Sequence, residues 1–104
     1  MRAAEALSDP TRRRIVELLA EQELSAGALA AEFPTSRPAV SRHLRVLRAH
    51  GLVRVRGEAQ RRLYSLDPAP LAELDAWLGR YRSFWAQRLD ALETELRRTR
   101  RKTT

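Results

Sequence analysis

The chain lacks cysteine, and it contains no long apolar run. Without thiols, disulfides and thiolate-based metal or redox sites are excluded. No apolar stretch approaches the 18 residues that a membrane span needs, and the first 20 residues lack the apolar segment of a secretory signal. These absences predict a cytoplasmic protein.

Residue patterns that would carry catalysis or hold a cofactor are also missing. No nucleophile–base pair, pair of carboxylates or glycine-rich phosphate loop is evident. The two histidines, His43 and His50, have no acidic residue between them, and residues 67–104 contain no histidine. A zinc or copper ion needs several converging nitrogen or sulfur ligands. We therefore expect no enzyme activity, no cofactor and no metal site.

What the chain does have is an uneven distribution of positive charge. It carries 20 Lys and Arg against 13 Asp and Glu, a net charge of +7, and every basic residue except Lys102 is Arg. Residues 37–62 hold eight Arg and one acid, Glu58, so this segment alone matches the net charge of the chain. Such a patch is typical of a nucleic-acid-binding surface, and the alternative is a solvated basic face.

Residues 25–50 have the pattern of a helix-turn-helix. Ser25 and Ser36 are placed to cap two helices, over about 26–32 and 37–50, and a Phe-Pro pair lies in the turn between them. The glycine that follows His50 is a signal for the end of a helix. The second helix contains no acidic residue, so its arginines have no charge partner within the helix.

This second helix has two unlike sides. Val40, Leu44 and Leu47 lie on one side at helical spacing, which predicts a side packed on a core. The opposite side carries small residues and arginines, which allow close approach to a groove and reach base edges or phosphates. In a helix-turn-helix, the N-terminal part of the second helix reads the bases. The candidate DNA-contacting residues here are Ser36, Arg37, Pro38, Ser41, Arg42, His43 and Arg45.

The N-terminal part of the chain predicts two further helices. The first covers residues 2–8, and the second covers residues 10–21, with Asp9 as its cap and Pro10 at its first position. The basic run Arg12–Arg14 is interpreted as a solvated face, because two glutamates lie within helical reach of it.

Residues 52–66 predict a β-hairpin. Residues 52–56 alternate apolar and charged side chains, residues 57–60 have the composition of a turn, and residues 61–66 return as a second strand. A hairpin directly after a DNA-reading helix is a wing, which lies along the backbone or in the minor groove. The candidate contact residues of this wing are Arg56, Gln60, Arg61 and Arg62.

The last predicted helix covers about residues 71–100. Apolar residues recur every three or four positions through more than seven turns, over a length of about 45 Å. A helix this long has apolar surface to spare, so we expect it to pair with its counterpart in a second copy, although its aromatic residues are also compatible with a small-molecule pocket. The basic tail 97–102 is either a solvated end or a phosphate contact. The candidate interface residues of this helix are Leu71, Leu74, Leu78, Tyr81, Trp85, Leu89 and Leu92.

Three segments resemble a known family of regulators. They are ALSDPTRRRIVELL (6–19), RPAVSRHLRVLRAHGLV (37–53) and RRLYSL (61–66). With a helix at each end, they resemble the ArsR/SmtB-type winged-helix repressors over roughly residues 3–96. The resemblance implies a homodimer that binds an inverted-repeat operator and represses transcription. It also implies dimerisation through the first and last helices, which adds Leu7 to the candidate interface.

The chain departs from the best-known members of this family at their metal sites. Those sensors use Cys before the turn, or Asp and His on the last helix, and residues 21–33 contain neither Cys nor His. The pattern WL…YR.FW…L over residues 77–89 resembles a metal-independent subgroup instead. Relatives often carry Gly-Arg where Ala59-Gln60 stands, so we expect Arg61 and Arg62 to take over as phosphate contacts.

We therefore expect one winged helix-turn-helix domain over residues 1–104, mainly α with a small β-hairpin (α-α-α-α-β-β-α). Its parts are the helix-turn-helix 25–50, the wing 52–66 and the dimerisation helix 71–100. Its expected partners are a palindromic double-stranded DNA operator and a second copy of the chain, which would place it at the nucleoid. The alternative is a dimerising module whose basic face binds a protein or RNA. RNA is disfavoured because the aromatic residues are expected to be buried.

Overall fold

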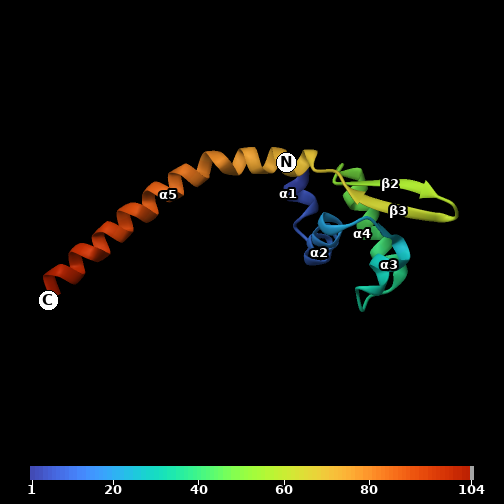
Figure 1. Cartoon of the computed structure of the whole chain (residues 1–104), viewed down its shortest axis with the longest axis horizontal. Helices are drawn as coiled ribbons and strands as arrows, with labels where there is room; N and C mark the ends of the chain where they lie inside the picture. Colours follow the sequence, from blue (N-terminus) through green and yellow to red (C-terminus); the bar gives the residue numbers. More distant parts are fainter. Residues whose placement is uncertain (104) are drawn as a thin grey trace. The chain divides into compact units, whose positions relative to one another are not determined.

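The computed structural model describes residues 1–103, and it divides into two compact units, Met1–Leu74 and Asp75–Thr104. The first unit holds four helices, three strands and the first turns of a fifth helix, which continues through the second unit (Figure 1). In chain order the elements are α1 (Arg2–Ala6), α2 (Pro10–Glu21), β1 (Leu24–Ser25), α3 (Ala26–Ala31), α4 (Arg37–Ala49), β2 (Val53–Glu58), β3 (Arg61–Leu66) and α5 (Ala69–Thr103).

Side-chain caps fix the starts of the three central helices. The Asp9 carboxylate accepts a hydrogen bond from the Arg12 amide at 3.0 Å, at the start of α2. The hydroxyls of Ser25 and Ser36 do the same for the third amide that follows each of them, at 3.1 and 3.3 Å. Each cap satisfies one amide that the helix itself leaves unpaired. The three predicted caps are confirmed.

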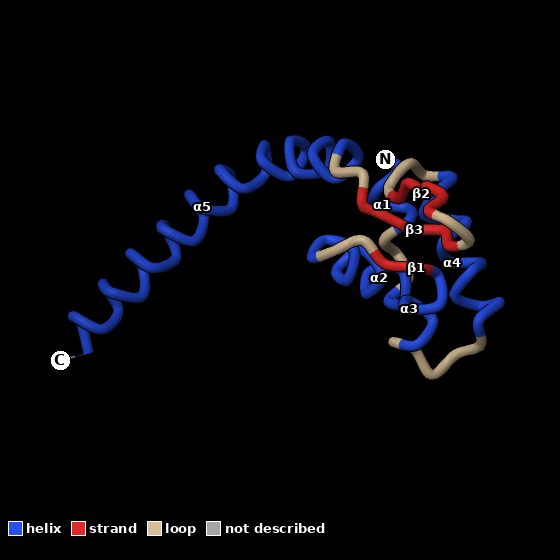
Figure 2. The backbone as a smooth tube through the Cα atoms, turned by 45° about the vertical axis from the view of Figure 1, so that its right-hand side comes forward, coloured by secondary structure: helices blue, strands red, loops and turns tan. Residues whose placement is uncertain are grey.

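The sheet has one strand more than the sequence predicts. Its order is β1-β3-β2 with all neighbours antiparallel, so β3 is the central strand (Figure 2). The additional strand β1 consists only of Leu24 and Ser25, which pair with Tyr64 and Leu63 of β3. Two residues are too few to show the alternation by which a strand is recognised in a sequence. This strand attaches the start of α3 to the wing.

The turn of the wing is shorter than predicted. The pairing of β2 with β3 runs from Val53 opposite Leu66 to Glu58 opposite Arg61, so only two residues connect the strands. One of them, Ala59, has a φ of 55°, as hairpin turns of this length require. The predicted four-residue turn 57–60 was wrong because Gly57 and Glu58 continue the strand, and Glu58 forms an ion pair with Arg56 at 3.3 Å.

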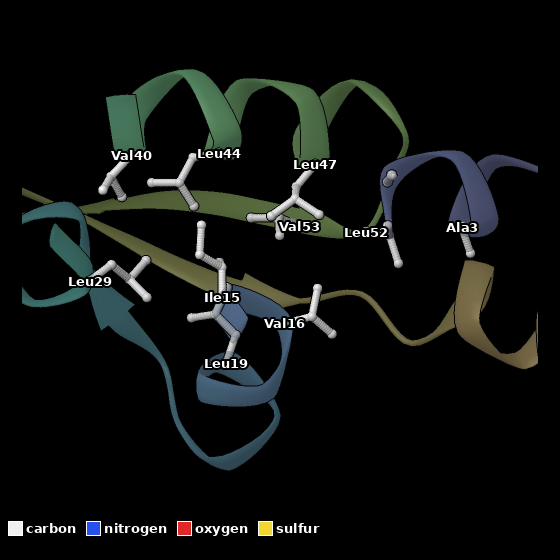
Figure 3. Packing of buried hydrophobic residues seen from close by; sticks show 11 residues of the cluster. Ala3, Ile15, Val16, Leu19, Leu29, Val40, Leu44, Leu47, Leu52 and Val53 are labelled. Carbon is white, nitrogen blue, oxygen red and sulfur yellow. The ribbon is translucent and has the colours of Figure 1, made fainter. Parts of the chain in front are cut away.

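One apolar core holds the first unit together. Val40, Leu44 and Leu47 extend from one side of α4 toward Ile15 of α2 and Leu29 of α3 (Figure 3). These five side chains are at most 2% exposed. Burial of an aliphatic side chain of this size contributes about 1.5–3 kcal/mol. The core therefore determines which side of α4 faces solvent, and the predicted packed side is confirmed.

A tight turn joins α4 to the wing. Gly51 has a φ of 76°, its amide donates to the Arg48 carbonyl, and the Leu52 amide donates to the Leu47 carbonyl, both at 3.0 Å. This is a Schellman motif, in which the left-handed residue is normally glycine. Leu52, the last residue before β2, is fully buried. The connection between α4 and the wing is therefore anchored in the core.

The α1–α2 junction corrects one interpretation of the sequence. α1 ends at Ala6, two residues earlier than predicted, and two arginines of α2 bond its last turn. Arg12 donates to the Ala6 carbonyl at 2.6 Å, and Arg13 donates to the Leu7 carbonyl at 3.0 Å. Arg13 and Arg14 are exposed, as the interpretation as a solvated face requires, and Arg14 forms an ion pair with Glu17, whereas Arg12 is half-buried. Arg12 and Arg13 also satisfy carbonyls that the short helix leaves unpaired.

The last helix begins earlier and ends later than the predicted range 71–100. Asp67 accepts a hydrogen bond from the Ala69 amide at 3.1 Å, and this bond is the main cause that lowers the pKa of the Asp67 carboxyl. In the first unit, Leu71 and Leu74 pack against the core. With its wing after the helix-turn-helix α3–α4, and with mainly helical structure around a small sheet, the protein is a winged helix-turn-helix, as predicted.

The Asp9 cap gives a first prediction, on stability. The bond from the Arg12 amide is the main cause that lowers the pKa of Asp9 from its ordinary value of 3.8. A carboxyl whose pKa is lower in the folded state stabilises the fold above its unfolded pKa, and loses that effect as the pH falls through the folded pKa. Asp9→Ala is expected to reduce the free energy of unfolding by about 1 kcal/mol at pH 7. This difference from wild type should shrink below about pH 4.

Urea denaturation at a series of pH values measures this effect. Asp9→Asn is the matched control, because asparagine removes the charge but remains a good N-cap. It should stay closer to wild type than Asp9→Ala at neutral pH. Equal losses in both variants would mean that the charge of Asp9, rather than its cap, stabilises the fold.

Candidate nucleic-acid interface

The solvent side of α4 is polar and cationic. Ser36 caps the helix, Pro38 occupies its first turn, where no amide donor is needed, and no acidic residue lies in that turn. Because the opposite side of α4 is buried in the core, these polar residues face solvent. The exposed residues of this side are Arg37, Pro38, Ser41, Arg42, Arg45 and Arg48.

Ion pairs divide the arginines of residues 37–62 into two groups. Arg54 pairs with Asp67 at 3.1 Å, and Arg56 pairs with Glu23 at 3.0 Å and with Glu58 at 3.3 Å. Hydrogen bonding to Glu23 raises the pKa of Arg56 and lowers that of the Glu23 carboxyl. Within residues 1–103, the other six guanidiniums form no salt bridge. They are those of Arg37, Arg42, Arg45, Arg48, Arg61 and Arg62.

Five of the six unpaired guanidiniums line two hollows between α4 and the wing, and Arg42 lines neither. The first hollow has a volume of about 220 Å³ and contains three of these arginines; its lining residues are Ser41, Leu44, Arg45, Arg48, Arg62 and Tyr64. The second lies between the start of α3, the start of α4 and the wing tip; it is lined by Ser25, Ala26, Gly27, Arg37, Gln60, Arg61 and Arg62. The structure thus brings together predicted residues of the helix and of the wing.

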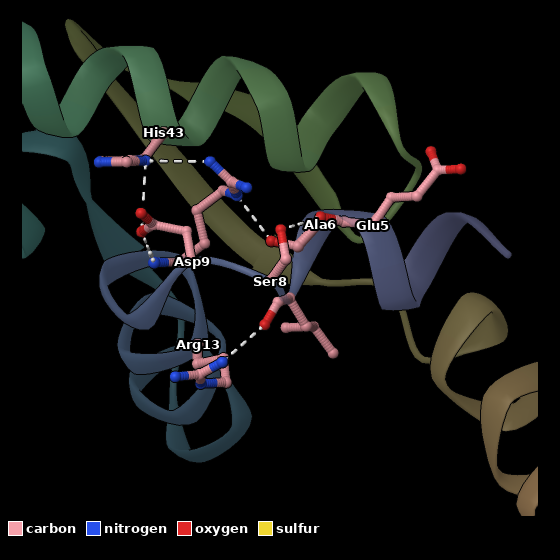
Figure 4. Close-up of polar contacts among 8 residues, drawn as sticks. Glu5, Ala6, Ser8, Asp9, Arg13 and His43 are labelled. Carbon is pink, nitrogen blue, oxygen red and sulfur yellow. Dashed lines mark hydrogen bonds and ion pairs between the residues drawn. The ribbon is translucent and has the colours of Figure 1, made fainter.

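Two predicted contact residues are already engaged elsewhere. Arg56 is held by Glu23 and Glu58, as described above. His43 lies on the side of α4 that faces the α1–α2 junction, with its Nδ1 3.7 Å from the Asp9 carboxylate and 3.5 Å from the Arg12 guanidinium (Figure 4). Its side chain is 25% exposed. The structure does not bring His43 to either hollow.

The structure also adds residues that the sequence prediction did not include. Arg48 lines the first hollow, and its place on the same side of the helix as Ser41 and Arg45 was a usable signal. Gly27 lines the second hollow, and no sequence pattern pointed to it. Glu23 holds Arg56 across 33 positions of the chain, a pairing that only the folded sheet brings about.

His50 and the acidic residues do not form a metal-ligand cluster. The His50 Nε2 lies 3.4 Å from the Glu5 carboxylate, and its Nδ1 lies 2.8 Å from the Val46 carbonyl. In the part of the chain that the structure describes, no group of three or more His, Cys, Asp or Glu side chains is placed to hold a metal ion. Nor does any helix of this part combine the length and apolarity needed to cross a membrane.

The residues predicted for a dimer interface fall into two sets. Leu7, Leu71 and Leu74 pack against the core of the first unit. The other five lie on α5 in the second unit and are 42% to 61% exposed; they are Leu78, Tyr81, Trp85, Leu89 and Leu92. The expectation that the aromatic residues are buried was therefore wrong for the helix over 77–85 in a single chain. Tyr64 and Phe33 are half-buried.

Comparison with known proteins agrees with this architecture. A family model described as a helix-turn-helix domain matches residues 7–56. The transcriptional regulator Rv2034 of Mycobacterium tuberculosis is 51% identical over 88 residues, which are 85% of this chain and 79% of that protein. The transcriptional repressor SdpR of Bacillus subtilis is 36% identical over 73 residues, which are 70% of this chain and 81% of that protein.

A solved structure supports the same assignment. The ArsR-like transcriptional regulator from Rhodococcus sp. RHA1 superimposes with a TM-score of 0.73 at 34% identity, covering 89% of this chain and 85% of that one. The names of all three relatives are those of transcriptional regulators and not of enzymes. The chain belongs to the ArsR/SmtB family of winged helix-turn-helix, DNA-binding transcriptional regulators.

Proposed function

We propose that this regulator is a homodimeric repressor that binds an inverted-repeat operator without sensing a metal. The observation that carries the proposal is the set of unpaired guanidiniums on α4 and β3. Like charges held close together repel, and a polyanion removes that repulsion. Two copies of α4 would enter successive major grooves about 34 Å apart, one turn of the duplex.

Within each half-site, the helix and the wing have different tasks. Arg42 and Arg45 are exposed on α4 and suit the O6 and N7 acceptors of guanine. The Ser36 hydroxyl accepts the helix-capping bond and keeps its own proton to donate to a phosphate. Arg61 and Arg62 of the wing would neutralise phosphates and add binding with little sequence preference. Arg56 contributes only after leaving Glu23.

The second unit supports the dimer. Along α5, Trp85 is 58% and Leu89 is 61% exposed, and they belong to an apolar stripe that continues for several turns. Such a stripe on a single helix is unfavourable in water, since every apolar side chain stays hydrated. A second copy offers a matching stripe, and it supplies the second α4 that a palindrome requires.

Repression follows from occupancy of a promoter, and SdpR is named a repressor. The test of the function as a whole is recovery of the DNA fragments that the protein binds across its genome. A palindromic consensus within promoters, with higher transcription of those genes when the protein is removed, is the expected result. Lower transcription on removal would make the protein an activator. Retention of RNA rather than duplex DNA in a competition assay would favour the alternative of an RNA-binding module.

The base-reading arginines give a second prediction. Arg42→Ala and Arg45→Ala should each weaken binding to the operator by about 1–3 kcal/mol if the residue reads a guanine, and should relax the preference at one base pair of each half-site. Binding to unrelated duplex should change much less. Gel-shift titrations with operator and scrambled DNA measure both effects.

Arg14→Ala is the matched control for these variants. It removes the same charge from an exposed arginine of α2 that is paired with Glu17, outside both hollows. It should leave operator affinity nearly unchanged, because an exposed ion pair contributes little to the fold. Undiminished operator affinity in both the Arg42 and Arg45 variants would overturn the assignment of α4 as the reading helix.

The apolar stripe gives a third prediction. Leu89→Asp introduces a charge into the stripe and should convert the dimer to a monomer at micromolar concentration, because a carboxylate cannot be buried there without a partner. Gln87→Asp adds the same charge two positions away, on the opposite side of the helix, and should stay dimeric. Light scattering after size exclusion measures both masses. A wild-type protein that is already monomeric would contradict the two-half-site proposal.

A further inference from the structure

The second hollow contains a close approach between Gly27 and Arg37. Gly27 is in the first turn of α3, and Arg37 is the first residue of α4. A Cβ added to Gly27 would lie 2.8 Å from Nη2 of Arg37, shorter than any ordinary contact, and 3.8 Å from its Cζ. The guanidinium therefore occupies the space that a side chain at position 27 would fill.

The backbone does not explain the glycine. Among the residues described, the one glycine with a positive φ is Gly51, so the backbone of Gly27 is open to any residue. A glycine inside a helix is less favourable than alanine, because it loses more conformational freedom on folding. What Gly27 provides is room for the guanidinium of Arg37.

The charges around this space indicate its ligand. Arg37 shares the hollow with Arg61 and Arg62, and the remaining lining residues are Gln60 of the wing tip and three small residues of β1 and α3. None of the residues that line this hollow is acidic, and its three guanidiniums are among those without an ion pair. Three positive groups around one hollow suit an anion, and guanidiniums match the oxygens of a phosphate.

We propose that this hollow is a clasp for one phosphate of the DNA backbone, and that Gly27 is the positioning residue that keeps Arg37 within it. Arg37 then holds the duplex without reading a base, although it starts the base-reading helix. The clasp rests on the proposed binding of duplex DNA. In it, residues of α3, α4 and the wing tip together hold one phosphate.

The substitution Gly27→Ala tests the clasp, because it should separate DNA binding from stability. The added methyl group displaces the guanidinium, which is the mobile end of a long side chain, so the fold can accommodate the change. The melting temperature should equal or exceed that of wild type, since alanine favours the helix. Affinity for duplex DNA should fall by about tenfold at low salt, since a charged hydrogen bond is lost.

The loss should have the signature of a phosphate contact. Operator and scrambled duplex should be weakened by the same factor, and the slope of log affinity against log salt should decrease by roughly one for each clasp lost, or two per dimer. Arg37→Ala should reproduce this pattern. The double variant Gly27→Ala/Arg37→Ala should bind no more weakly than Arg37→Ala alone, because the glycine acts only through the arginine.

Gly79→Ala is the matched control. It makes the same change at a helical glycine of α5, where an added Cβ meets nothing within 4 Å, and it should leave affinity and salt dependence unchanged. Wild-type binding by Gly27→Ala would overturn the clasp, as would additive losses in the double variant. A loss by Arg37→Ala that is confined to the operator would also overturn it, because Arg37 would then read a base.

These outcomes are distinct from failure of the proposed function. If wild type binds neither operator nor scrambled duplex, DNA binding itself fails, and the clasp fails with it. If wild type binds both and the Gly27→Ala variant matches it, the clasp alone fails.

Discussion

Burial of one side of α4 is the constraint on which the rest of the structure depends. Val40, Leu44 and Leu47 are the contacts through which α2 and α3 hold this helix. The helix has no other apolar side that could be buried instead. Its packing therefore fixes the arginines on the side that faces solvent. Loss of one of these leucines typically costs about 2–5 kcal/mol, so the core determines the orientation of the side that carries the arginines.

The arginines of this side have no carboxylate partner within their own helix, because α4 contains no acidic residue. Several carboxylates of the first unit are engaged elsewhere: Asp9 caps α2, Asp67 accepts a bond from the Ala69 amide at the start of α5, and Glu23 holds Arg56. The repulsion among the remaining guanidiniums is a cost of folding that the apolar core offsets. Released counterions then become part of the driving force for binding DNA, which makes affinity depend on salt.

Local patterns predicted much of this arrangement, and long-range pairings were beyond them. Caps at Asp9, Ser25 and Ser36, and the apolar side of α4, depend on residues within a turn or two, so the sequence displays them directly. The strand β1 and the ion pair of Arg56 with Glu23 depend on segments that only the folded sheet brings together. The close approach of Arg37 to Gly27 also depends on the folded structure, and a single glycine in the sequence gives no pattern that would predict it.

The turn at Gly51 has a consequence for how the protein meets a duplex. Only three residues, 50–52, separate α4 from β2. All three of their amides are bonded back onto the helix, and Leu52 is anchored in the core. The turn thus holds α4 and the wing in one fixed arrangement. If α4 and the wing bind a duplex as proposed, a duplex whose groove width does not match this arrangement must deform, so its bending stiffness, as well as its base identity, would help to decide which sites are occupied.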